Sequence, residues 1–300
     1  MKKNWFWGVV SVIFISWIGN TIYFESKQLK EPVILNTYID VPSSENTSFT
    51  LLYITNKNEV VELDSLLVDG YTYSNERNYF PWFGEPSAQS YKQEFTHHFL
   101  KEALFTLSED DIKRLHESIQ TDNVLARFTN GQVIPLKVDR LNFKPNKPQD
   151  IEFANMSGGS YNNTTEREII YIKDAITMNA FELPKAIQQN IDIKIMLWKD
   201  TNKGSSKEQE VSMQNWTDID APLYTDVNWP LQIEVGDTVG LFFHTKDDID
   251  DVKPIALMQD WTGVNAHGKS IRHGISIQVD PIFSQKQVNT VVKKARGEEK

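Results

Sequence analysis

The segment IDIKIMLW, residues 191–198, carries the clearest strand pattern in this chain of 300 residues. Aliphatic residues occupy positions 191, 193, 195 and 197, and Asp192, Lys194, Met196 and Trp198 stand between them. A period of two places alternate side chains on opposite faces of an extended chain, so the segment predicts a half-buried strand. The same alternation recurs at Leu231–Val235, Val239–Phe243 and Ile271–Val279.

The first half of the chain gives similar signals. We expect strands at Val33–Val41, Phe49–Thr55 and Glu59–Leu63. Asn130-Gly131 lies between the apolar segments 125–128 and 132–138, and this dipeptide is the typical turn of a tight β-hairpin.

Helix signals are few in this region. Ser108 stands three residues before Asp111, which resembles a capping box and predicts a helix over Glu109–Gln120. Thr96–Phe105 and Phe181–Gln189 are candidates for further short helices.

A polar segment with two prolines, Lys144–Gln149, is the best candidate for a domain boundary. We therefore expect a β-rich module with one or two short helices at 31–148 and a β-sandwich or jelly-roll-like module at 149–283. The predicted fold class is mainly β with minor helix, and α+β is the alternative.

The N-terminal block WFWGVVSVIFISWIGNTIYF, residues 5–24, carries no charge. A helix of this length spans about 30 Å, the hydrocarbon thickness of a bilayer. Lys2 and Lys3 precede it, which favours a short cytoplasmic start at 1–4 and a body outside the cytoplasm. A single-pass anchor in the lipid bilayer is the prediction. A cleaved signal peptide and a buried soluble helix are the alternatives.

Charge is unevenly distributed along the chain. The net charge is −10, but residues 1–30 and 284–300 each carry +3, which leaves −16 between them. An acidic body of this kind excludes a general nucleic-acid binder. We expect the basic segment 284–300 to be a flexible tail, with a short helix on an anionic membrane as the alternative.

The chain contains no cysteine, which excludes disulfides, thiolate metal sites and a thiol nucleophile. Together with the short basic start and the apolar anchor, this composition resembles that of exported proteins of Gram-positive bacteria. The resemblance implies a location at the cell surface and names no family.

One segment matches the phosphate-binding pattern G-x4-G-K-S, with Gly263, Gly268, Lys269 and Ser270. That chemistry needs a helix beginning at the lysine and serine. Here residues 270–279 alternate as a strand, so we interpret the segment as a turn between strands and the match as false.

Aromatic residues are concentrated between Tyr71 and Tyr91. Aromatic faces in a loop can stack on sugar rings or bind a partner, although a small β-module also needs aromatics in its core. The candidate binding residues are Tyr79, Phe80, Trp82 and Phe83.

We assign no catalytic residue, metal ligand or cofactor. His116 and Glu117 lack the second histidine of a zinc-protease helix, and His273 lies in an apolar strand pattern typical of a core histidine. The acidic run Asp247–Asp251 suits a solvated turn, with Ca²⁺ binding as the alternative. The sequence thus predicts a membrane-anchored binding or accessory protein with an envelope protein or a glycan as partner. A carboxylate-dependent surface hydrolase is the alternative.

Overall fold

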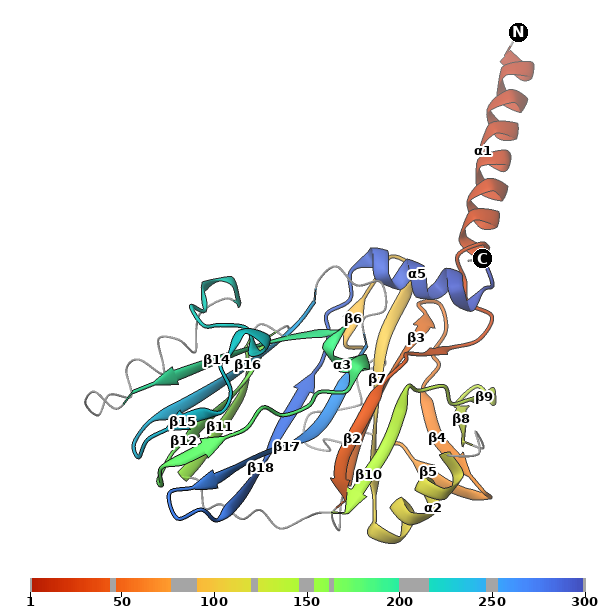
Figure 1. Cartoon of the computed structure of the whole chain (residues 1–300). Helices are drawn as coiled ribbons and strands as arrows, with labels where there is room; N and C mark the ends of the chain where they lie inside the picture. Colours follow the sequence, from red (N-terminus) through yellow and green to blue (C-terminus); the bar gives the residue numbers. More distant parts are fainter. Residues whose placement is uncertain are drawn as a thin grey trace, which may run out of the picture.

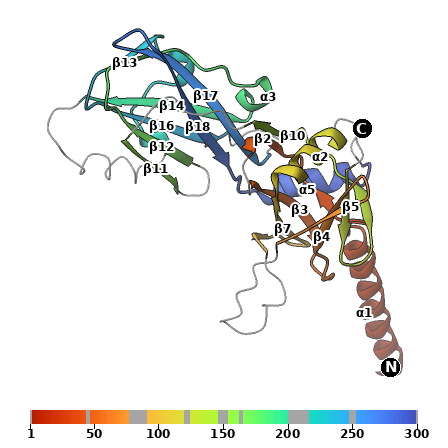
Figure 2. The same ribbon diagram turned by 90° about the horizontal axis from the view of Figure 1, so that it is seen from below.

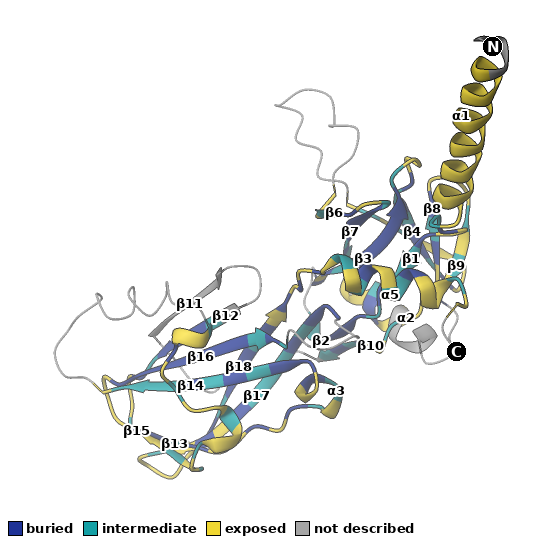
Figure 3. Ribbon diagram, turned by 90° about the horizontal axis from the view of Figure 1, so that it is seen from above, coloured by how far each residue is buried: buried dark blue, intermediate teal, exposed yellow. Residues whose placement is uncertain are grey.

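The structure is a computed structural model, and it describes residues 2–43, 47–76, 91–119, 124–145, 154–161, 165–199, 216–246 and 253–298. The first element, α1 (Lys2–Glu25), stands away from a β-rich body (Figure 1). Its side chains are exposed along its described length, in contrast to the buried strands of the body (Figure 3). Within the described part of the chain, this helix is the one long and apolar enough to cross a membrane.

Two four-stranded sheets form the first module. One has the order β1 (Val33–Ile34), β3 (Thr47–Asn56), β7 (His98–Leu107) and β6 (Gln93–Glu94). The other has the order β5 (Tyr71–Ser74), β4 (Leu63–Val68), β8 (Val124–Phe128) and β9 (Val133–Pro135). Their shared core includes Phe49, Tyr53, Phe105 and Phe128, and α2 (Glu109–Ile119) adds Ile112 to it.

A larger sheet joins the two halves of the chain. Its order is β10 (Arg140–Pro145), β2 (Tyr38–Ser43), β17 (Ile255–Asn265), β13 (Ile176–Met178) and β15 (Leu231–Ile233), and β18 (Ser270–Val279) also pairs with β17. β2 runs parallel to both β10 and β17, so the first predicted module contributes two strands to the sheet of the second. Strands from both sides of the predicted boundary at 144–149 therefore belong to one sheet, and the two parts of the body lie side by side (Figure 2).

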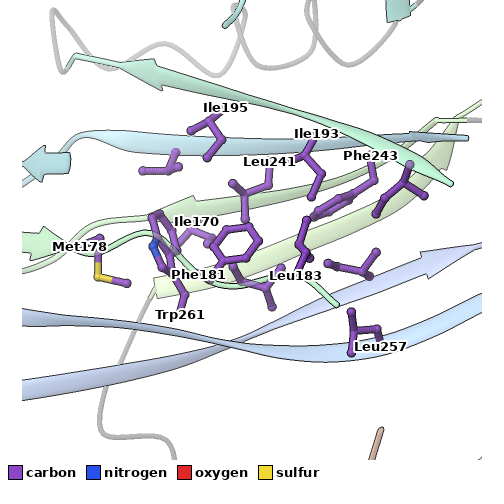
Figure 4. Packing of buried hydrophobic residues seen from close by; sticks show 14 of the residues in the cluster. Ile170, Met178, Phe181, Leu183, Ile193, Ile195, Leu241, Phe243, Leu257 and Trp261 are labelled. Atoms are coloured by element: carbon purple, nitrogen blue, oxygen red, sulfur yellow. The ribbon is translucent and has the colours of Figure 1, made fainter. Parts of the chain in front are cut away.

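The second module is closed by a fourth sheet with the order β11 (Ala154–Tyr161), β12 (Thr165–Tyr171), β16 (Thr238–Thr245) and β14 (Ile191–Trp198). This sheet faces β17 and β18 across an apolar core (Figure 4). The aliphatic residues of the 191–198 segment enter that core, and Trp261 is fully buried in it. Short helical turns, α3 (Lys185–Gln188), η1 (Trp216–Asp218) and η2 (Tyr224–Asp226), occupy the connections.

A terminal helix, α5 (Gln285–Ala295), covers the outer face of the first module. Val288 and Val292 pack against Leu52 and Ile54 of β3 and Leu100 of β7. The end of β3 packs against apolar residues on both faces, so its residues 51–56 are all buried. Burial therefore does not alternate with a period of two in this part of the strand.

Three expectations need correction. The segment 284–300 is not a flexible tail over its described length: Ser284 and Gln287 form a capping box that begins α5. Thr96–Phe105 lies mostly in β7, not in a helix, because it pairs along its length with β3. The strand expected at Glu59–Leu63 begins only at Leu63, as β4.

Other expectations are confirmed. The helix at Glu109 has its predicted cap, with Ser108 Oγ 2.5 Å from Asp111 Oδ2. Asn130-Gly131 connects the hairpin of β8 and β9, and Gly131 has a φ of +85° that glycine adopts without strain. The chain is mainly β, as the alternation predicts.

Candidate functional site

The predicted binding residues Tyr79, Phe80, Trp82 and Phe83 lie outside the described residues. The aromatic residues on either side of them are described. Tyr71 is exposed and packs on the Arg114 guanidinium, 4.4 Å from its ring centroid. Tyr91 is exposed and stacks on Phe99 of β7, with the ring centroids 4.6 Å apart.

Both ends of this aromatic segment are attached to β7. The amide of Glu76 donates a hydrogen bond to the Leu104 carbonyl at 2.8 Å. The amide of Lys92 donates to the Leu100 carbonyl, also at 2.8 Å. The described residues on either side of 77–90 are thus attached to the same strand of the first module.

A cavity of about 520 Å³ lies between the two modules, beside Lys92. Residues of β2, β3 and β7 line one side, and the ends of β17 and β18 line the other. Lys92 Nζ is 3.5 Å from Glu102 Oε2 and also pairs with Asp280. Ile39 and Ile255 contribute apolar side chains to the lining of the cavity.

This cavity brings two carboxylates together, as a surface hydrolase would require. Glu102 and Asp280, however, share one lysine ammonium, and their side chains are 56% and 50% exposed. A general acid uses a carboxyl in an apolar setting, whereas these two carboxylates are exposed and paired with one lysine. The arrangement does not favour acid catalysis.

The phosphate-loop match forms a β-hairpin. β17 ends at Asn265 and β18 begins at Ser270, where a phosphate-binding loop would need a helix. The amides of His267 and Lys269 both donate to the side-chain oxygen of Asn265 at 3.0 Å. These N–H groups therefore stabilise the turn instead of being available to a phosphate.

Gly263 has a packing reason to be glycine. A Cβ at this position would lie 2.2 Å from the Thr177 carbonyl oxygen and 2.8 Å from the Met178 sulfur. Gly268 has a φ of +75° in the hairpin turn and open space around it. Close strand approach and turn geometry thus account for both glycines of the motif.

The junction between α1 and the body is held by side-chain hydrogen bonds that no sequence pattern predicted. Asn56 donates from Nδ2 to the Leu29 carbonyl and accepts the Leu29 amide on Oδ1, each at 2.8 Å. Arg296, which follows α5, donates to the Ser26 carbonyl just after α1. Residues far apart in the sequence thus hold the chain where it leaves the apolar helix.

His98 lies in the same junction. Its Nε2–H donates to the Lys27 carbonyl at 3.1 Å, and the residue is 2% exposed. Burial lowers the pKa of His98 to about 4 from its ordinary 6.5, because the charged imidazolium would lose its hydration. The neutral ring is therefore the form that the junction accommodates.

His273 is the core histidine that the alternation predicts. It is 1% exposed, and its Nε2 lies 3.2 Å from Glu168 Oε1, which links β18 to the facing strand β12. The other carboxylate oxygen of Glu168 accepts the amide of Ser276 at 3.1 Å. This arrangement is a buried polar bridge between two sheets.

The remaining titratable candidates do not converge. No group of three or more His, Asp or Glu side chains suited to a metal ion occurs among the residues for which coordinates are described. The acidic run Asp247–Asp251 and the side chain of His116 fall outside those residues.

Comparisons with known proteins add little. No protein-family model matches the sequence, and no curated protein matches it. Among solved structures, the crystal structure of the collagen adhesin from S. aureus is similar over 84% of this chain and 94% of that chain, with 10% sequence identity and a TM-score of 0.21. A TM-score this low does not establish a common fold.

Proposed function

We propose that the protein is a single-pass membrane protein whose β-rich body, including a β-sandwich second module, lies outside the cytoplasm. We propose further that it acts there by binding rather than by catalysis. The observation that carries the proposal is α1. Its span Trp5–Glu25 is 21 residues long, and none of it is buried against the body. A helix of this kind in water would expose a large apolar surface, which a bilayer removes.

The orientation rests on charge. Lys2 and Lys3 precede the span, and the long acidic body follows it. The positive-inside tendency places the lysines in the cytoplasm and the body outside. The absence of cysteine suits an exported chain that needs no disulfide.

The binding partner is proposed from the aromatic segment. Tyr79, Phe80, Trp82 and Phe83 offer large flat faces of the kind that bind glycans or protein partners. The described residues on each side of them are fixed to β7, which supports a loop presented by a rigid strand. An envelope protein or a glycan remains the proposed partner.

Two measurements test the membrane part. Alkaline extraction of membranes from the native host should leave the full chain in the pellet, and its intact mass should include residues 5–24. A chain that begins beyond residue 24 would show that the segment is a cleaved signal. Because the chain lacks cysteine, His267→Cys provides one thiol, which an impermeant maleimide should label in intact cells.

The binding part needs a separate experiment. The tagged full-length protein should co-purify a partner from its own membrane, and replacement of the four aromatics by alanine should abolish that recovery. Unchanged recovery would contradict the aromatic surface while leaving the membrane anchor untouched.

A further inference from the structure

The C-terminal end of α5 lies beside the residue that follows the apolar helix α1. The helix lies across the side of the body from which α1 leaves (Figure 1). Arg296 donates to the carbonyl of Ser26, the first residue after α1. If α1 spans the bilayer, Ser26 lies at the level of the lipid headgroups, and the end of α5 lies there with it.

The two faces of α5 differ in chemistry. Val288 and Val292 are buried against the first module. Lys286, Lys293 and Lys294 are exposed. Lys286 and Lys293 are seven residues apart, so they lie on the same side of the helix, about 10 Å apart along its axis.

The surrounding charge strengthens this contrast. Residues 284–298 carry four basic side chains and one acidic side chain, Glu298, which pairs with Arg296 at 2.7 Å. Nearby on the first module, Glu94 pairs with Lys57. The exposed lysines therefore form a positive surface on a strongly acidic protein.

We propose that this lysine surface, formed by Lys286, Lys293 and Lys294, binds the anionic phosphate headgroups of the bilayer that holds α1. The inference rests on the membrane anchoring proposed above. Two arguments favour a lipid partner: the complementary charge, and the contact of Arg296, just after α5, with Ser26, just after the helix proposed to enter the membrane. The contact fixes the tilt of the body relative to the membrane, which α1 alone leaves free.

The chain is suited to a direct measurement because it has no native thiol. Asn289→Cys places a fluorophore on exposed α5, and His267→Cys places one in the hairpin turn at the far end of the body from α1 (Figure 1). Each full-length protein is reconstituted into phosphatidylcholine vesicles with or without phosphatidylglycerol. A trace lipid with a quencher on its headgroup reports contact.

The matched variants remove equal charge from two places. The test variant carries Lys286→Gln, Lys293→Gln and Lys294→Gln. The control carries Lys173→Gln, Lys185→Gln and Lys269→Gln, which are exposed on the second module. Circular dichroism establishes that both fold.

We expect quenching at residue 289 to rise with phosphatidylglycerol and to fall in high salt, while residue 267 is unaffected. Each lysine near an anionic surface changes the ratio of docked to undocked protein about fivefold, so the test variant should lower it about a hundredfold. The control variant should show the same quenching at residue 289 as the protein that keeps all its lysines.

Three results would overturn the inference. The first is quenching at residue 289 that does not depend on phosphatidylglycerol. The second is an equal loss of quenching in both triple variants. The third is quenching that increases with protein concentration, which indicates contact with a second copy. Flotation with the vesicles is scored separately. Protein that floats without lipid-dependent quenching refutes the α5 contact alone, whereas protein that does not float refutes the anchoring.

Discussion

Gly263→Ala tests whether the phosphate-loop pattern reflects strand packing or nucleotide chemistry. Gly263 pairs with Met178 of β13 on one side and with Ile271 of β18 on the other. A Cβ would meet the Thr177 carbonyl oxygen at 2.2 Å and the Met178 Cα at 3.0 Å. These are backbone atoms, so no side-chain rotation relieves the contact and β13 must move.

The cost can be worked from this geometry. Ordinary contacts between carbon and a carbonyl oxygen are about 3.3 Å or longer, so the strands must separate by about 1 Å. Overpacking of this kind costs about 1–3 kcal/mol. Weakened hydrogen bonds between β13 and β17 add about 0.5–1.5 kcal/mol each. A total of about 3–5 kcal/mol lowers the melting temperature of a body this size by about 10 °C.

Thermal unfolding in detergent, followed by far-ultraviolet circular dichroism, measures the effect on the full chain. Gly268→Ala is the control, because its φ of +75° is strained for alanine but the space around it is open. We expect it to cost about 1–2 kcal/mol. Lys269→Ala should leave the melting temperature unchanged. The reasoning is refuted if Gly263→Ala melts like the parent, or if Mg²⁺ and ATP stabilise the parent and Lys269→Ala abolishes that effect.

Buried polar contacts give three more expectations. The pKa of His98 is about 4 in the folded protein, against an ordinary value of 6.5. The free energy of unfolding should therefore be highest above pH 6.5 and fall by about 3 kcal/mol as the pH drops to 4. His98→Gln keeps an N–H donor and should reduce this pH dependence when unfolding is measured at several pH values. Glu168→Ala should cost about 3 kcal/mol in denaturant unfolding, because His273 and the Ser276 amide lose buried acceptors. Asn56→Ala should cost about 2 kcal/mol and speed tryptic release of the body from α1, because it removes both bonds to the backbone after the helix.

Each expectation has a result that contradicts it. For His98, this is an unchanged pH slope in the glutamine variant. For Glu168, a cost equal to that of a surface substitution such as Glu182→Ala would show that the bridge contributes little. For Asn56, protease release at the parental rate would show that Arg296 and the buried apolar residues hold the junction without it.

Much of the second module could be predicted because several of its strands have one face more buried than the other. Ile191–Trp198 and Ile271–Val279 show this plainly, and both became strands with the expected side chains in the core. The N-terminal apolar helix, the Asn130-Gly131 turn and the Ser108 cap could also be predicted, because each depends on residues close in sequence. The hairpin at Gly263–Ser270 followed from the alternation of β18 alone.

The errors came from contacts between distant segments. In β7, the run Leu100-Lys101-Glu102-Ala103-Leu104 has good helix formers, but pairing with β3 outweighs that preference. In the last helix, the only apolar signal is a few valines, and the surface that buries them is assembled from β3 and β7. The parallel pairing of β2 with β17 leaves no local trace, since its cause is the arrangement of the whole sheet.

The junction shows the same limit. The sequence around Asn56, His98 and Arg296 contains no motif that indicates a contact with the end of α1. Its chemistry appears only when the end of β3, the start of β7 and the residue after α5 meet at the end of α1. The aromatic residues at 79–83 remain a prediction from composition.

The parallel pairing of β2 with β17 also sets an order of assembly. β2 is synthesised early, but the backbone groups of Tyr38 that face β17 have no partner strand until Ile255 has been synthesised. Until then the growing chain presents an open strand edge, the kind of surface that recruits other chains. A nonsense change anywhere before β17 would therefore leave a product with an open β2 edge, which we expect to be aggregation-prone and not merely shortened. Such distant pairing also predicts slow folding, because the two strands are separated by more than 200 residues of chain.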